Sequence, residues 1–410
     1  MSVNVKLGNN TINGVNVVRL EDATTSGTYH NFNLATSGMY KVTCYVDNDV
    51  YTAIEVEQGK SIDSITSPTK NGYAFVGWST TSGGNKDITF PLTPSGNMSI
   101  YAVFTTWKCT VAGLGSSSPA SVTFTHSGTM PTFEEVTLNG DTFIKFPTMY
   151  RKIVSDNSNQ ITSFIISTMK EDNTYYPYPC FVKEDGTSVM PYILVGKWMS
   201  SSSSEMNSNG VVGQTSGRQS QTIANGRTNA RAKGTGYQLY DWQIQKLWQD
   251  LIICKMNTIN TNSGSGITTD ALGIEWENSG SWIDGLTYNI NSKTYIFSYK
   301  PSKYVNEATT STDGYQGCGY THSGTSGQEI SKLGYSSTHP FVNYPTATTN
   351  NSSYNTYYCD YFAFSTSGTT TPVLSDVGAA NANRGAFYCN ANNGWAIALG
   401  VRLCYRPLSA

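Results

Sequence analysis

The chain has 410 residues, enough for two or three domains with a substantial buried core. Only 13% of the residues are charged and the net charge is −2, so the clustered lysine and arginine that phosphate contacts require are missing. This excludes nucleic-acid binding. Tyrosine occupies 27 positions among many Ser, Thr, Asn and Gly residues, a composition typical of proteins that recognise a partner by surface contact.

Eight cysteines are scattered without C-x-x-C spacing, which argues against a zinc site and against a dense disulfide framework. The N-terminus lacks the basic-then-apolar pattern of a signal peptide, and no apolar run approaches the roughly 18 residues of a membrane span. We therefore expect a protein made in a reducing cytoplasm, without membrane insertion. A virion protein released by lysis satisfies these conditions.

Residues 1–36 alternate apolar and polar positions between Asn- and Gly-containing breaks, which predicts short β-hairpins. Hairpins of this size are unstable alone, so we expect the segment to dock onto something. It resembles the N-terminal attachment segments of phage structural proteins, and this implies contacts with other virion proteins. A small β-cap on the next domain is the alternative.

Residues 37–106 form the first clear module. The motifs PTKNGYAFVGW (68–78) and NMSIYAVF (97–104) resemble the Listeria–Bacteroides (internalin B-type) repeat. The resemblance implies a small β-grasp-like domain that acts mainly as a spacer in bacterial and phage surface proteins. The aromatic residues expected to fill its core are Tyr73, Phe75 and Trp78.

Residues 107–140 are rich in Ser, Thr, Gly and Pro and are interpreted as a linker or lead-in. Within residues 141–410 the strongest helix begins after Asp241, the expected N-cap, and apolar side chains recur every three or four residues up to Met256. Irregular turns then lead to two strand-like segments near the C-terminus. The residues expected to form their scaffold are Phe387, Tyr388, Val401 and Leu403.

The terminal stretch GAFYCNANNGWAIALGVRLCY (385–405) resembles the variable region of C-type-lectin-fold proteins diversified by retroelements, of the major tropism determinant type. Earlier strands resemble lectin-fold domains related to the formylglycine-generating enzyme. These resemblances imply an α+β, C-type-lectin-like fold for residues 141–410, a homotrimer, and an exposed face with exchangeable side chains. The ligand-binding residues expected on this face are Ala379, Asn381, Asn383, Asn390, Asn392, Asn393, Trp395, Ile397 and Leu399.

We expect no catalytic residue, metal site or cofactor. The EPN- or QPD-type loop of calcium-dependent sugar binding does not occur, and Cys389 and Cys404 are fifteen positions apart, unlike the close copper-binding pair of the formylglycine-generating enzyme. The function expected is that of a phage virion adhesin that binds a host-cell surface receptor, either protein or glycan. The alternatives are a structural decoration protein without a ligand, and an enzyme of the formylglycine-generating type.

Overall fold

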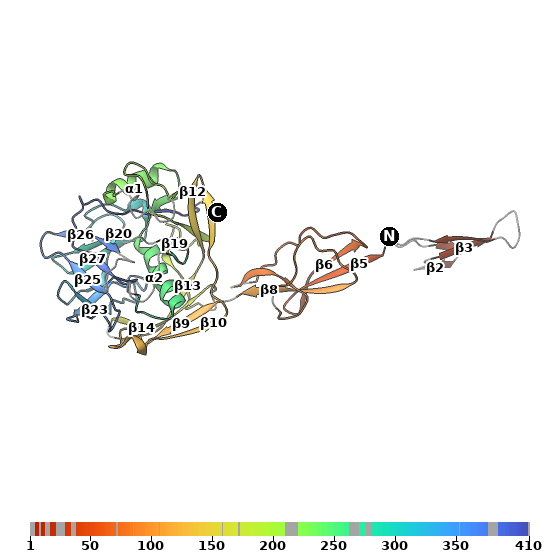
Figure 1. The fold of residues 1–410 in the computed structure, drawn as a ribbon, viewed down its shortest axis with the longest axis horizontal. Helices are drawn as coiled ribbons and strands as arrows, with labels where there is room; N and C mark the ends of the chain where they lie inside the picture. The colour runs from red at the N-terminus through yellow and green to blue at the C-terminus, as the bar shows by residue number, and fades with distance from the viewer. Residues whose placement is uncertain are drawn as a thin grey trace. The chain divides into compact units, whose positions relative to one another are not determined.

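The chain divides into two compact units, residues 1–105 and 106–410 (Figure 1). A computed structural model describes residues 5–7, 10–12, 17–21, 29–33, 38–70, 73–84, 86–105, 107–157, 159–170, 173–209, 220–261, 270–275, 281–351, 353–375 and 384–408. None of the helices among these residues combines the length and the apolar character that crossing a membrane requires.

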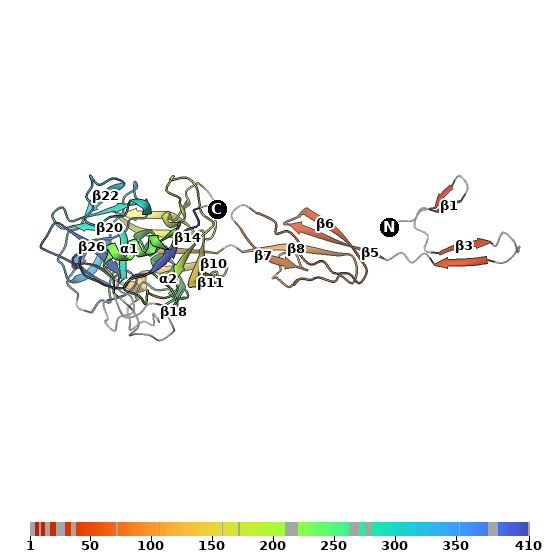
Figure 2. The ribbon, with the colours of Figure 1, turned by 90° about the horizontal axis from the view of Figure 1, so that it is seen from above.

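The first unit contains two short hairpins and one four-stranded sheet. The hairpins pair β1 (Val5–Leu7) with β2 (Asn10–Ile12) and β3 (Val17–Glu21) with β4 (Tyr29–Asn33). The sheet is built from β5 (Met39–Val46), β6 (Asp49–Glu57), β7 (Ala74–Ser79) and β8 (Met98–Thr105). Its order is β6-β5-β8-β7, and β5 and β8 run parallel in the middle (Figure 2). The described residues of this unit contain no α-helix.

The aromatic residues of the first unit do not all lie in its core. Trp78 is buried, and the ring of Phe75 packs against it at 5.4 Å. Tyr73, which the sequence analysis places in the core, is 38% exposed instead. The ammonium of Lys70 lies 4.2 Å from the centre of its ring. At the surface the tyrosine ring can bind the lysine ammonium on its face while its hydroxyl stays hydrated, and both contacts stabilise the exposed position.

Three sheets and one short strand pair build the second unit. The first sheet, of order β10-β9-β14-β13-β15, contains β9 (Lys108–Ala112), β10 (Thr123–Ser127), β13 (Tyr150–Asn157), β14 (Gln160–Ser167) and β15 (Tyr176–Pro177). The second, of order β11-β12-β16-β28-β17, contains β11 (Glu134–Leu138), β12 (Asp141–Pro147), β16 (Tyr192–Gly196), β17 (Tyr237–Leu239) and β28 (Leu403–Tyr405). The separate pair is β18 (Asp270–Ala271) with β19 (Ile274–Glu275).

The third sheet has eight strands in the order β22-β21-β20-β26-β27-β25-β23-β24. Its strands are β20 (Ser281–Asn289), β21 (Thr294–Ser298), β22 (Tyr315–Thr321), β23 (Gln328–Leu333), β24 (Pro345–Thr349), β25 (Tyr361–Phe364), β26 (Thr370–Ser375) and β27 (Cys389–Ala391). The pair β25 and β27 is parallel, whereas the other neighbours are antiparallel.

Residues 107–140, which composition assigns to a linker, contribute β9, β10 and β11 to the second unit. In β9, Cys109 and Val111 are buried while the residues between them are half-buried. This is the alternation of a half-covered strand. Strand β9 is only five residues long, so its alternating pattern is hard to recognise within the surrounding Ser- and Gly-rich sequence.

The two α-helices among the described residues are α1 (Ile223–Ala232) and α2 (Trp242–Met256). The predicted cap of α2 is confirmed, because Asp241 Oδ1 accepts the N–H of Ile244 at 3.0 Å. The helix ends at Asn257, whose φ of 53° is left-handed. It is buried on all sides rather than along one stripe, and its buried polar residues include Gln245 and Gln249.

The α+β, C-type-lectin-like fold expected for residues 141–410 is wrong, because the structure is mostly β. Its two α-helices are only 10 and 15 residues long. The third sheet was missed because its strands lack the period-two pattern. In β20, eight of nine residues are buried, so side chains on both faces are covered. A strand covered on both faces loses its alternation and then resembles irregular chain in a composition rich in Gly, Ser and Tyr.

Candidate functional site

Six of the nine expected ligand-binding residues lie on one continuous stretch, residues 390–399, which we call the C-terminal arch. The described members are Asn390, Asn392, Asn393, Trp395, Ile397 and Leu399. The remaining three, Ala379, Asn381 and Asn383, lie outside the described residues.

The C-terminal arch connects two sheets. It begins in β27, which lies between β25 and β26 in the third sheet (Figure 1). It leads to β28 of the second sheet. Near this end, Leu399 exchanges two backbone hydrogen bonds with Gln221, at 2.8 and 3.0 Å, and the carbonyl of Gly400 accepts the N–H of Trp282 at 3.2 Å. Both ends of the arch are therefore fixed by backbone pairing.

Buried side chains flank the arch on both sides. The predicted scaffold is confirmed, since Phe387, Tyr388, Val401 and Leu403 are all buried. The buried polar residues of α2 also contribute, because Gln249 Nε2 donates to the carbonyl of Ala386 at 3.0 Å. The N–H of Ala386 in turn donates to Thr261 Oγ1 at 2.7 Å.

Asp360 lies fully buried beneath the turn that precedes β27. Its Oδ2 accepts the N–H of Phe387 at 2.7 Å, while its Oδ1 is buried without a hydrogen-bond partner among the described residues. Burial raises the pKa of this carboxyl well above its usual value, although the backbone donors oppose the shift. The side chain thus satisfies the N–H of Phe387, while the N–H of Tyr388 donates to the carbonyl of Gly385 within the turn at 3.1 Å.

Asn390 supports the arch rather than projecting from it. Its Oδ1 accepts the N–H of Asn392 at 2.8 Å, and its Nδ2 donates to the hydroxyl of Tyr388 at 3.1 Å. An asparagine that accepts a backbone N–H two residues ahead forms an Asx-turn, which sets the direction of the chain. The amide of Asn390 is therefore engaged within the protein.

The side chains beyond Asn390 are the available ones. Asn392 is exposed and Asn393 half-buried, and neither side-chain amide has a hydrogen-bond partner among the described residues. Ile397 is 42% exposed at a turn in which its N–H donates to the carbonyl of Gly394 at 3.1 Å. Trp395 differs from these residues, because its half-buried side chain packs against the buried cluster around Val401 and its indole nitrogen is itself buried. Amides and apolar groups together suit contact with a partner surface.

A row of three tyrosines, which we call the tyrosine row, adjoins the arch. Tyr361 stacks on Tyr388 with ring centres 6.1 Å apart and planes 11° apart, and Tyr354 meets Tyr361 edge-on at 6.0 Å. The guanidinium of Arg384 lies 5.4 Å from the centre of the Tyr388 ring. The sequence analysis did not assign these residues to the site. The signal that marks them is the tyrosine-dense run at 354–361.

The chemistry open to this site depends on the two cysteines next to the arch, and on any grouping of metal-binding side chains in the described part of the chain. Among the described residues, no cluster of His, Cys, Asp and Glu is arranged to hold a metal ion. Cys389 lies in β27 and Cys404 in β28, so the two thiols belong to different sheets. Both are buried, and burial raises the pKa of each thiol above its usual value. Neither thiol is activated as a nucleophile, which requires a lowered pKa.

Comparison with protein families finds one match, in the first unit. Residues 40–103 match the Listeria-Bacteroides repeat domain. This range contains all four strands of the β6-β5-β8-β7 sheet apart from their outermost residues. A comparison of the chain with curated proteins gives no match.

Proposed function

We propose that this chain, in which a Listeria-Bacteroides repeat domain precedes a larger β-rich unit, is a phage virion adhesin. In this proposal the C-terminal arch and the two half-buried members of the tyrosine row, Tyr354 and Tyr361, together form the surface that contacts a receptor on the host cell. The repeat domain acts as a spacer, and the N-terminal strands attach the chain to other virion proteins. The protein would bind by surface complementarity and perform no chemistry.

The observation that carries the proposal is a rigidly held arch with unengaged side chains. One end is paired with β25 and β26 and the other with Gln221 and Trp282, while the side-chain amides of Asn392 and Asn393 have no partner among the described residues. A fixed backbone reduces the entropy lost on binding. Tyrosine and asparagine side chains then supply contact area and adaptable hydrogen bonds. Such a surface also tolerates replacement of its side chains, as a retroelement-diversified region requires.

The affinity of a single copy is expected to be modest, because the arch is a small surface. A homotrimer would present three such surfaces together, and many trimers on one particle would convert weak contacts into stable adsorption. The same arrangement allows the receptor to be either a protein or a glycan.

The double substitution Asn392→Ala and Asn393→Ala tests this function. Because both amides lack partners within the described structure, we expect the melting temperature to remain within about 1 °C, as is usual for surface changes. Binding of the fluorescently labelled chain to bacterial cells that the unsubstituted chain binds should fall at least about tenfold. Binding is measured by flow cytometry over a concentration series.

The matched control is Asn157→Ala, an exposed asparagine at the end of β13 in the first sheet. This change should leave cell binding unaltered. If the Asn392/Asn393 double variant binds cells as well as the Asn157 variant does, the arch is not the contact surface. The alternative of a structural decoration protein would then be preferred.

A further inference from the structure

The two edge strands of the third sheet come together at one end. Ser323, just beyond β22, pairs with Ala347 of β24 in a single β-bridge. The N–H of Ser323 donates to the carbonyl of Thr346 at 2.6 Å. Thr348 Oγ1 extends this junction by donating to the carbonyl of Thr325 at 2.8 Å. Because β22 and β24 are the first and last strands of the sheet, their junction closes the sheet only in part.

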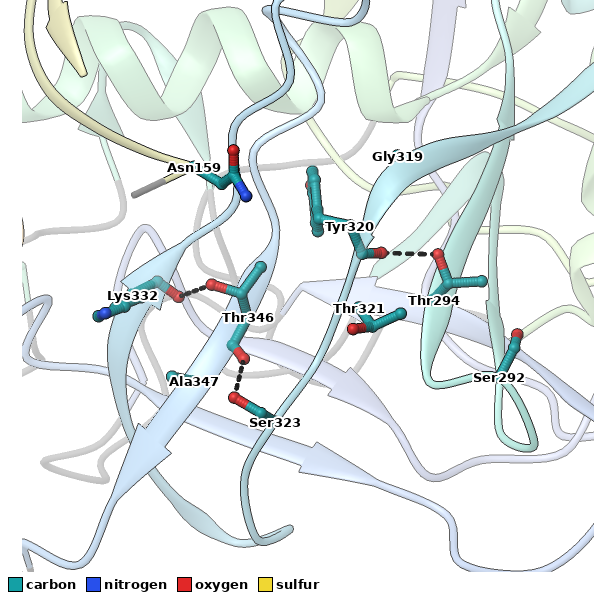
Figure 3. A pocket seen from close by; sticks show the side chains of 10 residues that line it. All are labelled: Asn159, Ser292, Thr294, Gly319, Tyr320, Thr321, Ser323, Lys332, Thr346 and Ala347. Atoms are coloured by element: carbon teal, nitrogen blue, oxygen red, sulfur yellow. Dashed lines mark hydrogen bonds between the residues drawn. The ribbon is translucent and has the colours of Figure 1, made fainter. Parts of the chain in front are cut away.

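A polar cavity of about 580 Å³ lies at this seam (Figure 3). We call it the seam cavity. Tyr320 is held in its lining, because the tyrosine hydroxyl donates to the carbonyl of Val342 at 2.7 Å and accepts the N–H of Tyr344 at 3.0 Å. Apart from β22 and the segment that follows it, the lining comes from the turns at Asn159 and Ser292 and from the strands β21, β23 and β24, with Lys332 on β23. The volume is within the range of small-molecule sites.

The hydroxyl groups of the seam cavity are oriented by the backbone. Thr294 Oγ1 donates to the carbonyl of Tyr320 at 2.8 Å, and Ser323 Oγ donates to that of Thr346 at 3.3 Å. Thr346 Oγ1 donates to the carbonyl of Lys332 at 3.5 Å, and Figure 3 shows all three contacts. A hydroxyl whose proton is engaged in this way keeps its lone pairs free. These oxygens are therefore hydrogen-bond acceptors, which suit a ligand with several hydroxyl donors.

Lys332 adds one positive charge to this lining. The residue is exposed, and it forms no ion pair with any residue that the structure describes. Its ammonium is therefore available to an anionic group. An inorganic phosphate, which is chiefly a hydrogen-bond acceptor, matches the lysine but not the acceptor oxygens. A ligand with one carboxylate and several hydroxyls matches both.

We propose that the seam cavity binds an acidic saccharide, with its carboxylate on Lys332 and its hydroxyls on the oxygens of Thr294, Ser323 and Thr346. This site is separate from the C-terminal arch. In the strand order, β27 lies three strands from β24 and four from β22. Saccharide binding at the seam cavity does not depend on the proposed adhesin function, because it can be measured with isolated sugars and without host cells.

Saturation-transfer NMR on the full chain tests the proposal. The probes are the methyl glycosides of glucuronic acid, galacturonic acid and N-acetylneuraminic acid, with methyl glucoside as the neutral counterpart. At least one acidic probe should receive saturation and methyl glucoside should not. Lys332→Gln should weaken binding of that probe about tenfold, the effect of losing one charge-assisted hydrogen bond. Thr346→Val, which removes an acceptor but keeps the side-chain shape, should also weaken it.

Lys255→Gln is the control, because it removes an exposed lysine at the end of α2 and should leave sugar binding unchanged. Melting temperatures verify that every variant is folded. The proposal is overturned if no acidic probe binds. It is also overturned if methyl glucoside binds equally well, or if Lys332→Gln binds the acidic probe as tightly as the unsubstituted chain.

Discussion

Replacement of Asp360 by alanine is expected to lower the free energy of unfolding of the second unit by about 2 kcal/mol. The carboxylate of Asp360 accepts the N–H of Phe387 in the buried turn before β27. Alanine leaves the N–H of Phe387 without a partner, and an unsatisfied buried donor costs about 1–3 kcal/mol. Urea unfolding followed by tryptophan fluorescence measures the change. Cell binding should be lost as well, because the same turn positions the C-terminal arch.

Asp360→Asn is the matched variant. The raised pKa of Asp360 means that burial favours the neutral carboxyl, and asparagine is a neutral group of nearly the same shape that keeps one acceptor oxygen. We therefore expect Asp360→Asn to retain most of the stability that alanine removes. Equal losses for the two variants would contradict the role assigned to the acceptor oxygen.

Acidification from pH 7 to pH 5 is expected to destabilise the second unit by about 2 kcal/mol through His322 alone. His322 is 2% exposed, its ring lies 5.0 Å from those of Phe362 and Phe364, and neither ring nitrogen has a hydrogen-bond partner among the described residues. Burial, assisted by the charge of Lys293, lowers the pKa of the imidazole from 6.5 to about 4. The unfolded chain therefore binds the proton more readily, so this stability is present above pH 6.5 and is lost as the pH falls towards 4.

The comparison that isolates this effect is between the unsubstituted chain and His322→Leu. Leucine can change the stability at pH 7, but it cannot titrate, so the loss between pH 7 and pH 5 should be smaller in the variant by about 2 kcal/mol. Chemical denaturation at several pH values measures both slopes. Identical slopes, or an NMR titration of His322 with a pKa near 6.5, would show that the imidazole is not buried as described.

Local signals in the sequence identified the parts of the fold that local physics determines. The cap at Asp241 follows from its side chain and the apolar residues after it, and it is present in the structure. Phe387 and Leu403 are buried as expected from their apolar side chains, although Phe387 lies in a turn before β27 and not in the strand that the sequence predicts. The repeat motif likewise marks residues 40–103 as a Listeria-Bacteroides repeat domain.

The parts that sequence reasoning missed depend on contacts between distant segments. Side chains on both faces of β20 are buried, so its sequence does not alternate between apolar and polar residues. Asn390 was expected at the contact surface, yet its amide is engaged by Asn392 and Tyr388. The hydrogen-bond partner of Asp360, Phe387, is 27 residues away, and only the folded turn brings its N–H within reach of the carboxylate.

The central claim is that the C-terminal arch faces the receptor, and site-directed labelling tests it most directly. All eight native cysteines are buried, so Asn392→Cys introduces a thiol that a polyethylene glycol maleimide reaches selectively. Asn157→Cys provides the same label on the first sheet. We predict that the label at position 392 abolishes binding to cells, whereas the label at position 157 leaves it intact. Undiminished binding by the chain labelled at position 392 would contradict the account.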